Sequence, residues 1–187
     1  MASLIPSGSA SGTGSMTLVA PVTNSNQTAT LPDATGTVMV SGNQPAFSAY
    51  LSAGQNITTN TFTKVACNTE EFDTASAYDN ATNYRFTPQV AGYYQVNGSI
   101  CVSATTIDGA ALAIYKNGST FKWGNYITRP AAIGDLDLVV GALIYLNGST
   151  DYIELYGYIS GTGTCTISVA VSGQARDYFQ AVLVRTA

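Results

Sequence analysis

Histidine is absent from the 187 residues of the chain, and charged residues are scarce. Without histidine, the Ser-His-Asp and Cys-His mechanisms of catalysis are excluded, together with most catalytic zinc sites. Only 10% of the residues are charged, whereas ordinary globular domains have about 25%. So few charges cannot cover the surface of a monomer, and we expect copies of the chain to cover apolar surface on one another.

Basic residues, long apolar runs and cysteines are also few. A formal net charge of -4 with no basic cluster argues against nucleic-acid binding, which depends on Lys and Arg. No run approaches the roughly 18 apolar residues of a transmembrane helix, so no membrane insertion is expected. The first residues, MASLIPSGSASGTGS, lack the features of a secretory signal, which favours assembly in a cytoplasm. Cys67, Cys101 and Cys165 fit neither a disulfide framework nor a zinc site, and we expect buried free thiols.

The composition changes near residue 44. Residues 1–44 are rich in Ser, Thr, Gly, Ala and Asn and carry a single charge, Asp33. The segments SMTLVAP and GTVMVSG have the alternation of short strands, but they are too few to enclose a core. We therefore predict an N-terminal arm, residues 1–44, that docks on another surface, followed by a globular head, residues 45–187.

The head has the pattern of an all-β fold. Runs rich in Tyr, Val, Ile and Thr are separated by Gly, Asn, Asp and Pro. YKNGST and YLNGST each contain Asn-Gly, the strongest short hairpin signal, and no helical periodicity is present. The pattern predicts a sandwich or jelly roll. The predicted strands are Ala46–Ser52, Thr61–Val65, Tyr84–Phe86, Gly92–Val102, Ala110–Lys116, Leu136–Leu146, Asp151–Tyr158, Thr164–Ser172 and Tyr178–Arg185.

Several phrases of the head carry a family resemblance. They are PAFSAYLS, TKVACNTEEFDTASAYDNATNYRFTPQVAGYYQVNGSI, LIYLNGSTDYIELYGY and the final YFQAVLVR. The spacing Phe-x5-Gly-x-Tyr, formed by Phe86, Gly92 and Tyr94, is a specific part of the signature. With these phrases, residues 45–187 resemble the globular head of complement component C1q, a jelly roll related to tumour necrosis factor (TNF).

This resemblance implies a homotrimer built around a threefold axis. One face of Gly92–Val102 would fill the core, and the opposite, tyrosine-bearing face would meet neighbouring subunits. Gly92 and Gly98 would permit a close backbone approach or a bulge. The side chains predicted for the trimer interface are Tyr93, Tyr94, Val96, Tyr156, Tyr158 and Phe179.

The arm carries a second resemblance. The segment GSMTLVAPVTNSNQTATLPDATGTVMVSG, with its phrase TLPDATGT, resembles a segment common in bacteriophage tail fibres and related virion proteins. This implies a virion protein, assembled in the host cytoplasm, whose residues 1–44 anchor it to tail or capsid proteins. The head would bind a host-surface glycan or protein, or would stabilise the particle as a capsid decoration. A free cytokine-like ligand is disfavoured by the missing export signal.

Two aromatic residues are candidates for contact with a glycan. Trp123 and Tyr126 lie in FKWGNYITRPAAIGD, which we predict to be a long loop. An exposed aromatic ring can stack on a sugar ring. The alternative is that Trp123 packs within or between subunits.

Acidic residues suggest two further sites. Glu70, Glu71 and Asp73 could supply the carboxylate pair of a polysaccharide depolymerase, although we expect a solvated loop and no enzymatic activity. Calcium requires six to eight oxygen ligands, which the few candidate Asp side chains do not supply by themselves. We therefore expect no cofactor. The only calcium candidates are Asp108, Asp135 and Asp137.

Overall fold

The structure, a computed structural model, describes residues 24–26, 44–132, 134–167 and 176–187, with the side chains of 129–132 excepted. The chain divides into two compact units, Met1–Thr37 and Val38–Ala187, and all described strands belong to the second. Most of the predicted arm, including TLPDATGT, lies outside the described residues. The arm and its boundary at residue 44 therefore stay predictions.

The described part of the head consists of strands and contains no helix, which confirms the all-β prediction. The strands are β1 (Ala46–Tyr50), β2 (Gln55–Asn56), β3 (Thr63–Lys64), β4 (Thr69–Asp73), β5 (Tyr78–Asp79), β6 (Arg85–Phe86), β7 (Gly92–Ser103), β8 (Thr106–Lys116), β9 (Ser119–Ala132), β10 (Leu136–Leu146), β11 (Ile153–Thr162), β12 (Thr166–Ile167) and β13 (Tyr178–Thr186).

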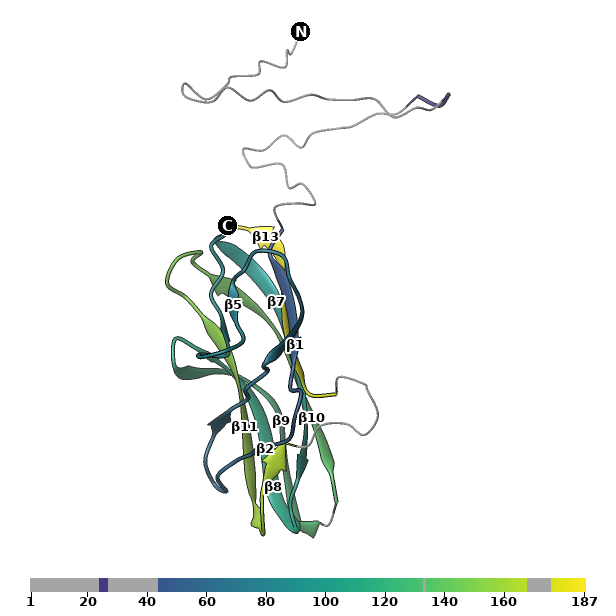
Figure 1. The fold of residues 1–187 in the computed structure, drawn as a ribbon, viewed down its shortest axis with the longest axis vertical. Helices are drawn as coiled ribbons and strands as arrows, with labels where there is room; N and C mark the ends of the chain where they lie inside the picture. The colour runs from purple at the N-terminus through teal and green to yellow at the C-terminus, as the bar shows by residue number, and fades with distance from the viewer. Residues whose placement is uncertain (1–23, 27–43, 133, 168–175) are drawn as a thin grey trace. The chain divides into compact units, whose positions relative to one another are not determined.

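These strands form two antiparallel sheets that run along the long axis of the head (Figure 1). The seven-stranded sheet has the order β2-β12-β7-β13-β1-β4, with β10 paired to the other side of β7. The six-stranded sheet has the order β5-β6-β11-β8-β9, with β3 also paired to β11. Strands that follow one another in sequence, such as β10 and β11, often lie in different sheets, as in a jelly roll.

Alternation along each strand separates the core from the outer surface. In β10, Leu138 and Ile144 are buried in the core, whereas Leu143 and Tyr145 are exposed on the outer face. β7 pairs with the whole length of β10 without a register shift. Gly92, Tyr94 and Val96 alternate with more exposed residues, and every residue from Gly98 to Val102 is buried. One face of the predicted strand Gly92–Val102 thus fills the core, as expected.

Aromatic rings at the centre of the core explain the Phe-x5-Gly-x-Tyr spacing. Phe47 stacks on Phe86 at a centroid distance of 4.6 Å, and Phe86 meets Tyr94 edge to face at 5.5 Å. A Cβ on Gly92 would lie 2.4 Å from the carbonyl oxygen of Arg185 in β13. The glycine therefore allows β13 to pack closely against the start of β7, where Tyr94 enters the core.

The two Asn-Gly pairs form different turns. Asn117 and Gly118 have φ angles of 53° and 78° and join β8 to β9 in a two-residue hairpin, as predicted. The second pair, Asn147-Gly148, follows β10 and leads to β11 in the other sheet. Here the Asn147 side chain accepts hydrogen bonds from the backbone N–H groups of Ser149, Thr150 and Asp151. The same dipeptide therefore makes a turn between sheets at this position instead of a hairpin.

Two segments predicted to be loops are strands. FKWGNYITRPAAIGD lies mostly in β9, and the acidic segment 69–73 is β4 at the edge of the seven-stranded sheet. Register shifts between β8 and β9 interrupt the alternation that would reveal a strand in the sequence. The predicted strand Thr164–Ser172 begins as β12, and its residues beyond Ile167 lie outside the described part.

The three cysteines are buried thiols that form no disulfide, as predicted. Burial raises the pKa of the Cys67 thiol to about 12, so this thiol stays protonated and unreactive at neutral pH.

A buried carboxylate closes a gap in the seven-stranded sheet. Along one side of β7, β13 ends its pairing at Ser99, and β12 begins at Val102. Asp177 lies in this gap, where its Oδ1 accepts a hydrogen bond from the backbone N–H of Cys101. Its Oδ2 has no hydrogen-bond partner among the described residues. Burial raises the pKa of Asp177 to about 6.

Asp177→Asn is expected to remove one component of the pH dependence of stability. The folded protein holds this proton more tightly than the unfolded chain, so the contribution of Asp177 to stability falls as pH rises from about 4 to about 6. Urea unfolding at pH 4.5 and 7.5 measures this contribution. In the wild type, Asp177 should add about 2 kcal/mol more to the free energy of unfolding at pH 4.5 than at pH 7.5, and Asp177→Asn should lack this difference. Equal pH dependence in both proteins would contradict this assignment.

Candidate functional site

Large exposed apolar side chains gather on two surfaces of the described head. One is the outer face of the seven-stranded sheet, and the other is β9 at the edge of the six-stranded sheet. The first set comprises Phe72, Tyr93, Val139, Leu143, Tyr145, Val182 and Val184, and the second comprises Phe121, Trp123 and Tyr126.

The first surface spans three neighbouring strands, β13, β7 and β10. We call it the apolar face and define it by Tyr93, Val139, Leu143, Tyr145, Val182 and Val184. The rings of Tyr93 and Tyr145 lie 5.5 Å apart, and Leu143 is 55% exposed. Leu143 and Val182 lie on opposite sides of Gln95, because β7 runs between their strands. The apolar face therefore covers one side of three adjacent strands, with the polar Gln95 between Leu143 and Val182.

The exposed side chains of β10 in the apolar face, Val139, Leu143 and Tyr145, form a ridge. A hollow lies beside this ridge on the same sheet. It has a volume of about 240 Å³, and its lining includes Phe72 of β4, Gln95 of β7 and Val182 of β13. The seven-stranded sheet thus presents an apolar ridge and a shallow hollow next to each other.

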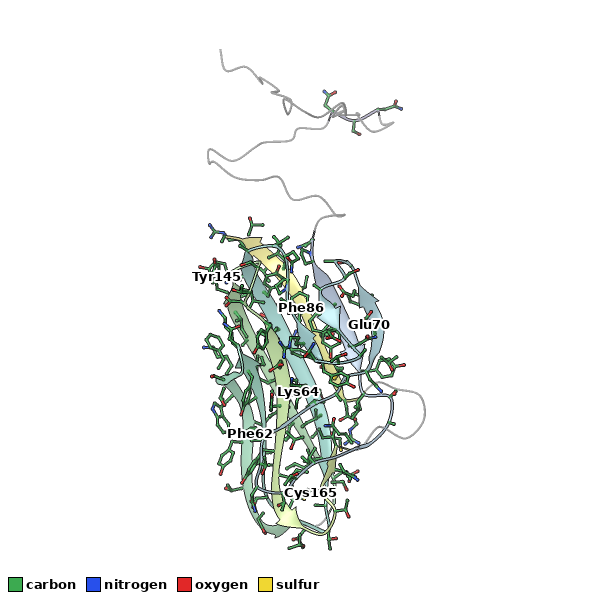
Figure 2. The ribbon with its side chains drawn as sticks, turned by 60° about the vertical axis from the view of Figure 1, so that its left-hand side comes forward. Phe62, Lys64, Glu70, Phe86, Tyr145 and Cys165 are labelled. Carbon is green, nitrogen blue, oxygen red and sulfur yellow. The ribbon has the colours of Figure 1, made fainter. Side chains whose placement is uncertain are left out.

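The second surface contains a groove lined by four aromatic side chains. We call it the aromatic groove, with a volume of about 540 Å³ and a lining of Phe62, Trp123, Tyr126 and Tyr158. Phe62 meets Trp123 edge to face at 5.2 Å, and Trp123 meets Tyr126 edge to face at 6.0 Å. Phe62 also lies 5.2 Å from Tyr158. In Figure 2, Phe62 lies on one side of the sandwich and Glu70 on the other.

Small residues form the floor below these rings. Ala111 and Ala113 of β8 are fully buried, and their partners across β9 are Tyr126 and Trp123. Across β11, Tyr158 is opposite Ala111. Two alanines between larger aromatic residues leave the space that the groove occupies.

The segment that carries Phe62 is fixed to the six-stranded sheet at both ends. Asn60 donates its backbone N–H to the carbonyl oxygen of Ile159 at 2.8 Å, and Val65 donates to Leu155 at 2.9 Å. The Lys64 ammonium lies 2.7 Å from the buried carboxylate of Glu154. These contacts hold Phe62 over the sheet.

The structure corrects the predicted trimer residues. Tyr94, Val96 and Phe179 are fully buried within the core of the head, so their side chains cannot meet another subunit. They alternate with the outward residues of their strands, so the predicted set combined residues from both faces. Tyr93 lies on the apolar face, and its contact with a neighbouring copy stays a prediction.

The other two tyrosines of that set lie on the six-stranded sheet. Tyr156 stacks on Tyr115 at 3.8 Å, and Tyr158 lines the aromatic groove. Trp123 and Tyr126 do lie together, on a strand and not on the predicted loop. Phe62 and Tyr158 were not recognised as their neighbours, because no sequence pattern links segments so far apart.

The acidic cluster is held by hydrogen bonds within the head. Ser48 donates its hydroxyl to Glu71 Oε2 at 2.6 Å. Asp73 accepts hydrogen bonds from the backbone N–H groups of Ala75 and Tyr78 at 3.1 and 2.8 Å. Glu71 and Asp73 thus stabilise the region around β4, and no carboxylate is part of the described lining of either hollow.

The calcium candidates are not gathered in a metal site. Asp137 forms an ion pair with Arg176, while Asp108 lies in β8 of the other sheet. Within the described ranges, no group of three or more Cys, Asp or Glu side chains is arranged to hold a metal ion. The same residues include no helix that is long and apolar enough to span a bilayer.

Comparison with solved structures identifies the architecture. The globular domain of zebrafish complement 1qA is similar with a TM-score of 0.52 and 16% identity, and the match covers 78% of this chain and 100% of that one. The fold is a C1q/TNF-like jelly roll. Eiger TNF from S. frugiperda gives a TM-score of 0.56 with 9% identity over 77% of this chain and 93% of that chain. Murine APRIL gives 0.54 with 9% identity over 76% and 100%.

Sequence comparison gives a different kind of relative for this jelly-roll chain. It is 28% identical over 113 residues to the Phage-like element PBSX protein XkdV of Bacillus subtilis strain 168. The match covers 57% of this chain and 16% of that protein, so the chain spans a small part of its relative's length. No protein-family profile matches the chain. The two comparisons together support a phage-related protein with a C1q/TNF-like head.

Proposed function

We propose that this chain is a bacteriophage virion structural protein, a homotrimeric fibre or capsid-decoration protein. Its head would contact the host surface or stabilise the particle, and residues 1–44 would anchor it to tail or capsid proteins. The proposal agrees with the similarity to a phage-element protein and with the C1q/TNF-like fold. The single observation that carries it is the apolar face.

The apolar face fits the subunit contact of a trimer. Val139 and Leu143 are 54% and 55% exposed on β10, and Val184 is 58% exposed on β13. Apolar surface of this extent in a chain with 10% charged residues favours self-association over solvation. The ridge on β10 and the hollow near Phe72 lie side by side and do not face each other. The ridge of one copy would fill the hollow of the next, a head-to-tail contact that closes into a three-membered ring when each step turns by about 120°.

The depolymerase alternative has less support from the geometry. A retaining glycosidase needs two carboxyl groups about 5 Å apart that face a substrate cleft, and an inverting enzyme needs about 6.5–9.5 Å. Glu71 and Asp73 accept hydrogen bonds from groups of their own head and line neither hollow. The structural role is therefore the function that the arrangement favours.

Deletion of residues 1–44 is expected to yield a folded head that no longer joins the particle. The described strands start at Ala46, so the sandwich keeps all of them after the deletion. Circular dichroism should retain the β signature, and the thermal midpoint should change by no more than a few degrees. Particles assembled with the truncated chain, analysed by gel electrophoresis and immunoblotting, should lack it.

The full-length chain is the control in the same assembly reaction. Incorporation of the truncated head at the full-length level would refute the anchoring role of the arm.

A further inference from the structure

The aromatic groove is too small to be the seat of a protein subunit. A fully covered aromatic side chain buries about 150–250 Å², and Trp123 and Tyr126 are 54% and 61% exposed. The four lining side chains therefore offer at most about 400 Å², no more than half of the area that each partner buries in a stable protein interface. The volume of about 540 Å³ is instead that of a site for a small ligand.

The chemistry of the groove is aromatic and uncharged. None of its described lining residues is Asp, Glu, Lys or Arg, so a charged ligand would lose its hydration without gaining an ion pair. Polar groups lie at the rim, where the Tyr158 hydroxyl donates to Asn60 Oδ1 at 3.2 Å. A ligand that fits this arrangement has a flat apolar face and hydroxyl groups at its edge.

The groove is also rigid before any ligand arrives. Trp123 and Tyr126 project from β9, whose long pairing with β8 fixes their backbone. Asn125 lies between them, and its Oδ1 accepts the backbone N–H of Val139 at 2.8 Å, which ties β9 to β10. A preformed site loses little conformational entropy on binding, so even a shallow contact contributes to affinity.

We infer that the aromatic groove binds a neutral saccharide, whose sugar rings stack on Trp123 and Tyr126. This inference rests on the proposed function, in which the head meets a surface, and it names the chemical class of the ligand. The groove lies on the six-stranded sheet, whereas the apolar face lies on the seven-stranded sheet. A trimer that buries the apolar face would thus carry three open grooves, and a polysaccharide could occupy more than one of them.

Fluorescence titration of the full-length chain tests the inference directly. Trp123 is the only tryptophan, so its emission reports on the groove alone. The probes are neutral oligosaccharides of glucose, galactose, mannose, rhamnose and N-acetylglucosamine, with a sulfated oligosaccharide as the charged comparison. At least one neutral probe should change the emission saturably, and the sulfated probe should not. Tyr126→Ala should weaken binding of that probe at least tenfold, because it removes one stacking ring.

Phe121→Ala is the matched control. Phe121 is 46% exposed on the same strand but does not line the groove, so its removal should change the affinity by less than twofold. The inference would be overturned by any of three results: no neutral probe changes the emission, Tyr126→Ala leaves the affinity unchanged, or only the sulfated probe binds. Binding of the protein to host envelopes is measured after the envelopes are treated with periodate or with protease. Binding that survives periodate oxidation but not protease digestion would indicate a protein partner and would also overturn the inference.

The oligomeric mass and particle incorporation of Tyr126→Ala are measured in the same preparations. Loss of saccharide binding with normal mass and incorporation supports the inference. Absence of saccharide binding by the wild-type protein, with normal mass and incorporation, overturns the inference and leaves the structural role intact. A monomeric wild-type chain that is absent from particles would refute the proposed function, whatever the saccharide result.

Discussion

Leu143→Lys is expected to dissociate the proposed homotrimer into monomers. Leu143 lies between Val139 and Tyr145 on β10, in the apolar face, where it is 55% exposed in the single chain. In a trimer that buries this face, each subunit would bring an ammonium group into an apolar contact, at a cost of several kcal/mol per ion. Light scattering at micromolar concentration should give three times the chain mass of 19.4 kDa for the wild type and a single chain mass for the variant.

Thr128→Lys is the control for this experiment. Thr128 is exposed on β9 of the other sheet, so the substitution adds the same charge away from the apolar face. This variant should keep the mass of the wild type. A wild-type mass of one chain, or a trimeric Leu143→Lys, would rule out the apolar face as the subunit contact.

Gly92→Ala is expected to lower the free energy of unfolding by at least about 3 kcal/mol. The added Cβ would lie 2.4 Å from the carbonyl oxygen of Arg185 and 2.7 Å from Leu183 Cδ1. Backbone at this position cannot move aside easily, because β13 is hydrogen-bonded to β7 on one side and to β1 on the other. Urea unfolding should show the loss as a lower midpoint with an unchanged slope.

Gly109→Ala in β8 is the matched comparison. Its added Cβ would meet the carbonyl oxygen of Ile127 at 3.5 Å and Ser160 Cβ at 3.8 Å, which are ordinary contacts. The change in stability should stay within about 0.5 kcal/mol, because the alanine fits and restricts the unfolded chain. Equal losses in both variants would show that the close approach at Gly92 has no special importance.

The sequence predicted two of the four side chains that line the candidate binding site. Trp123 and Tyr126 were predicted to contact a glycan because they stand in a segment expected to be a long exposed loop, and they do share a groove. Phe62 and Tyr158 could not be added, because they come from segments about 60 and 35 residues away from Trp123 in the chain. β11 pairs with β8, and the segment before β3 lies against that sheet, so only the folded chain brings these rings together.

The proposed subunit contact shows a second limit of prediction from the sequence. The sequence indicated that β7 has two faces, but not which one points inward, because aromatic residues stand at both Tyr93 and Tyr94. In the structure, Tyr94 contacts Phe86 and donates its hydroxyl to the carbonyl oxygen of Val90 at 2.7 Å. Those partners turn Tyr94 inward, and alternation then places Tyr93 outside.

The sequence alone determined the all-β class, the jelly-roll resemblance, most strand positions and the buried thiols, because alternation, turn residues and composition are local properties. Only the tertiary structure decided that the segment around Trp123 is a strand, that Asn147-Gly148 links two sheets and that Asp177 fills a gap beside β7. Each of these depends on which distant strand becomes the neighbour. A sheet is held together by hydrogen bonds between residues far apart in the chain, and those pairings leave little trace in any single segment.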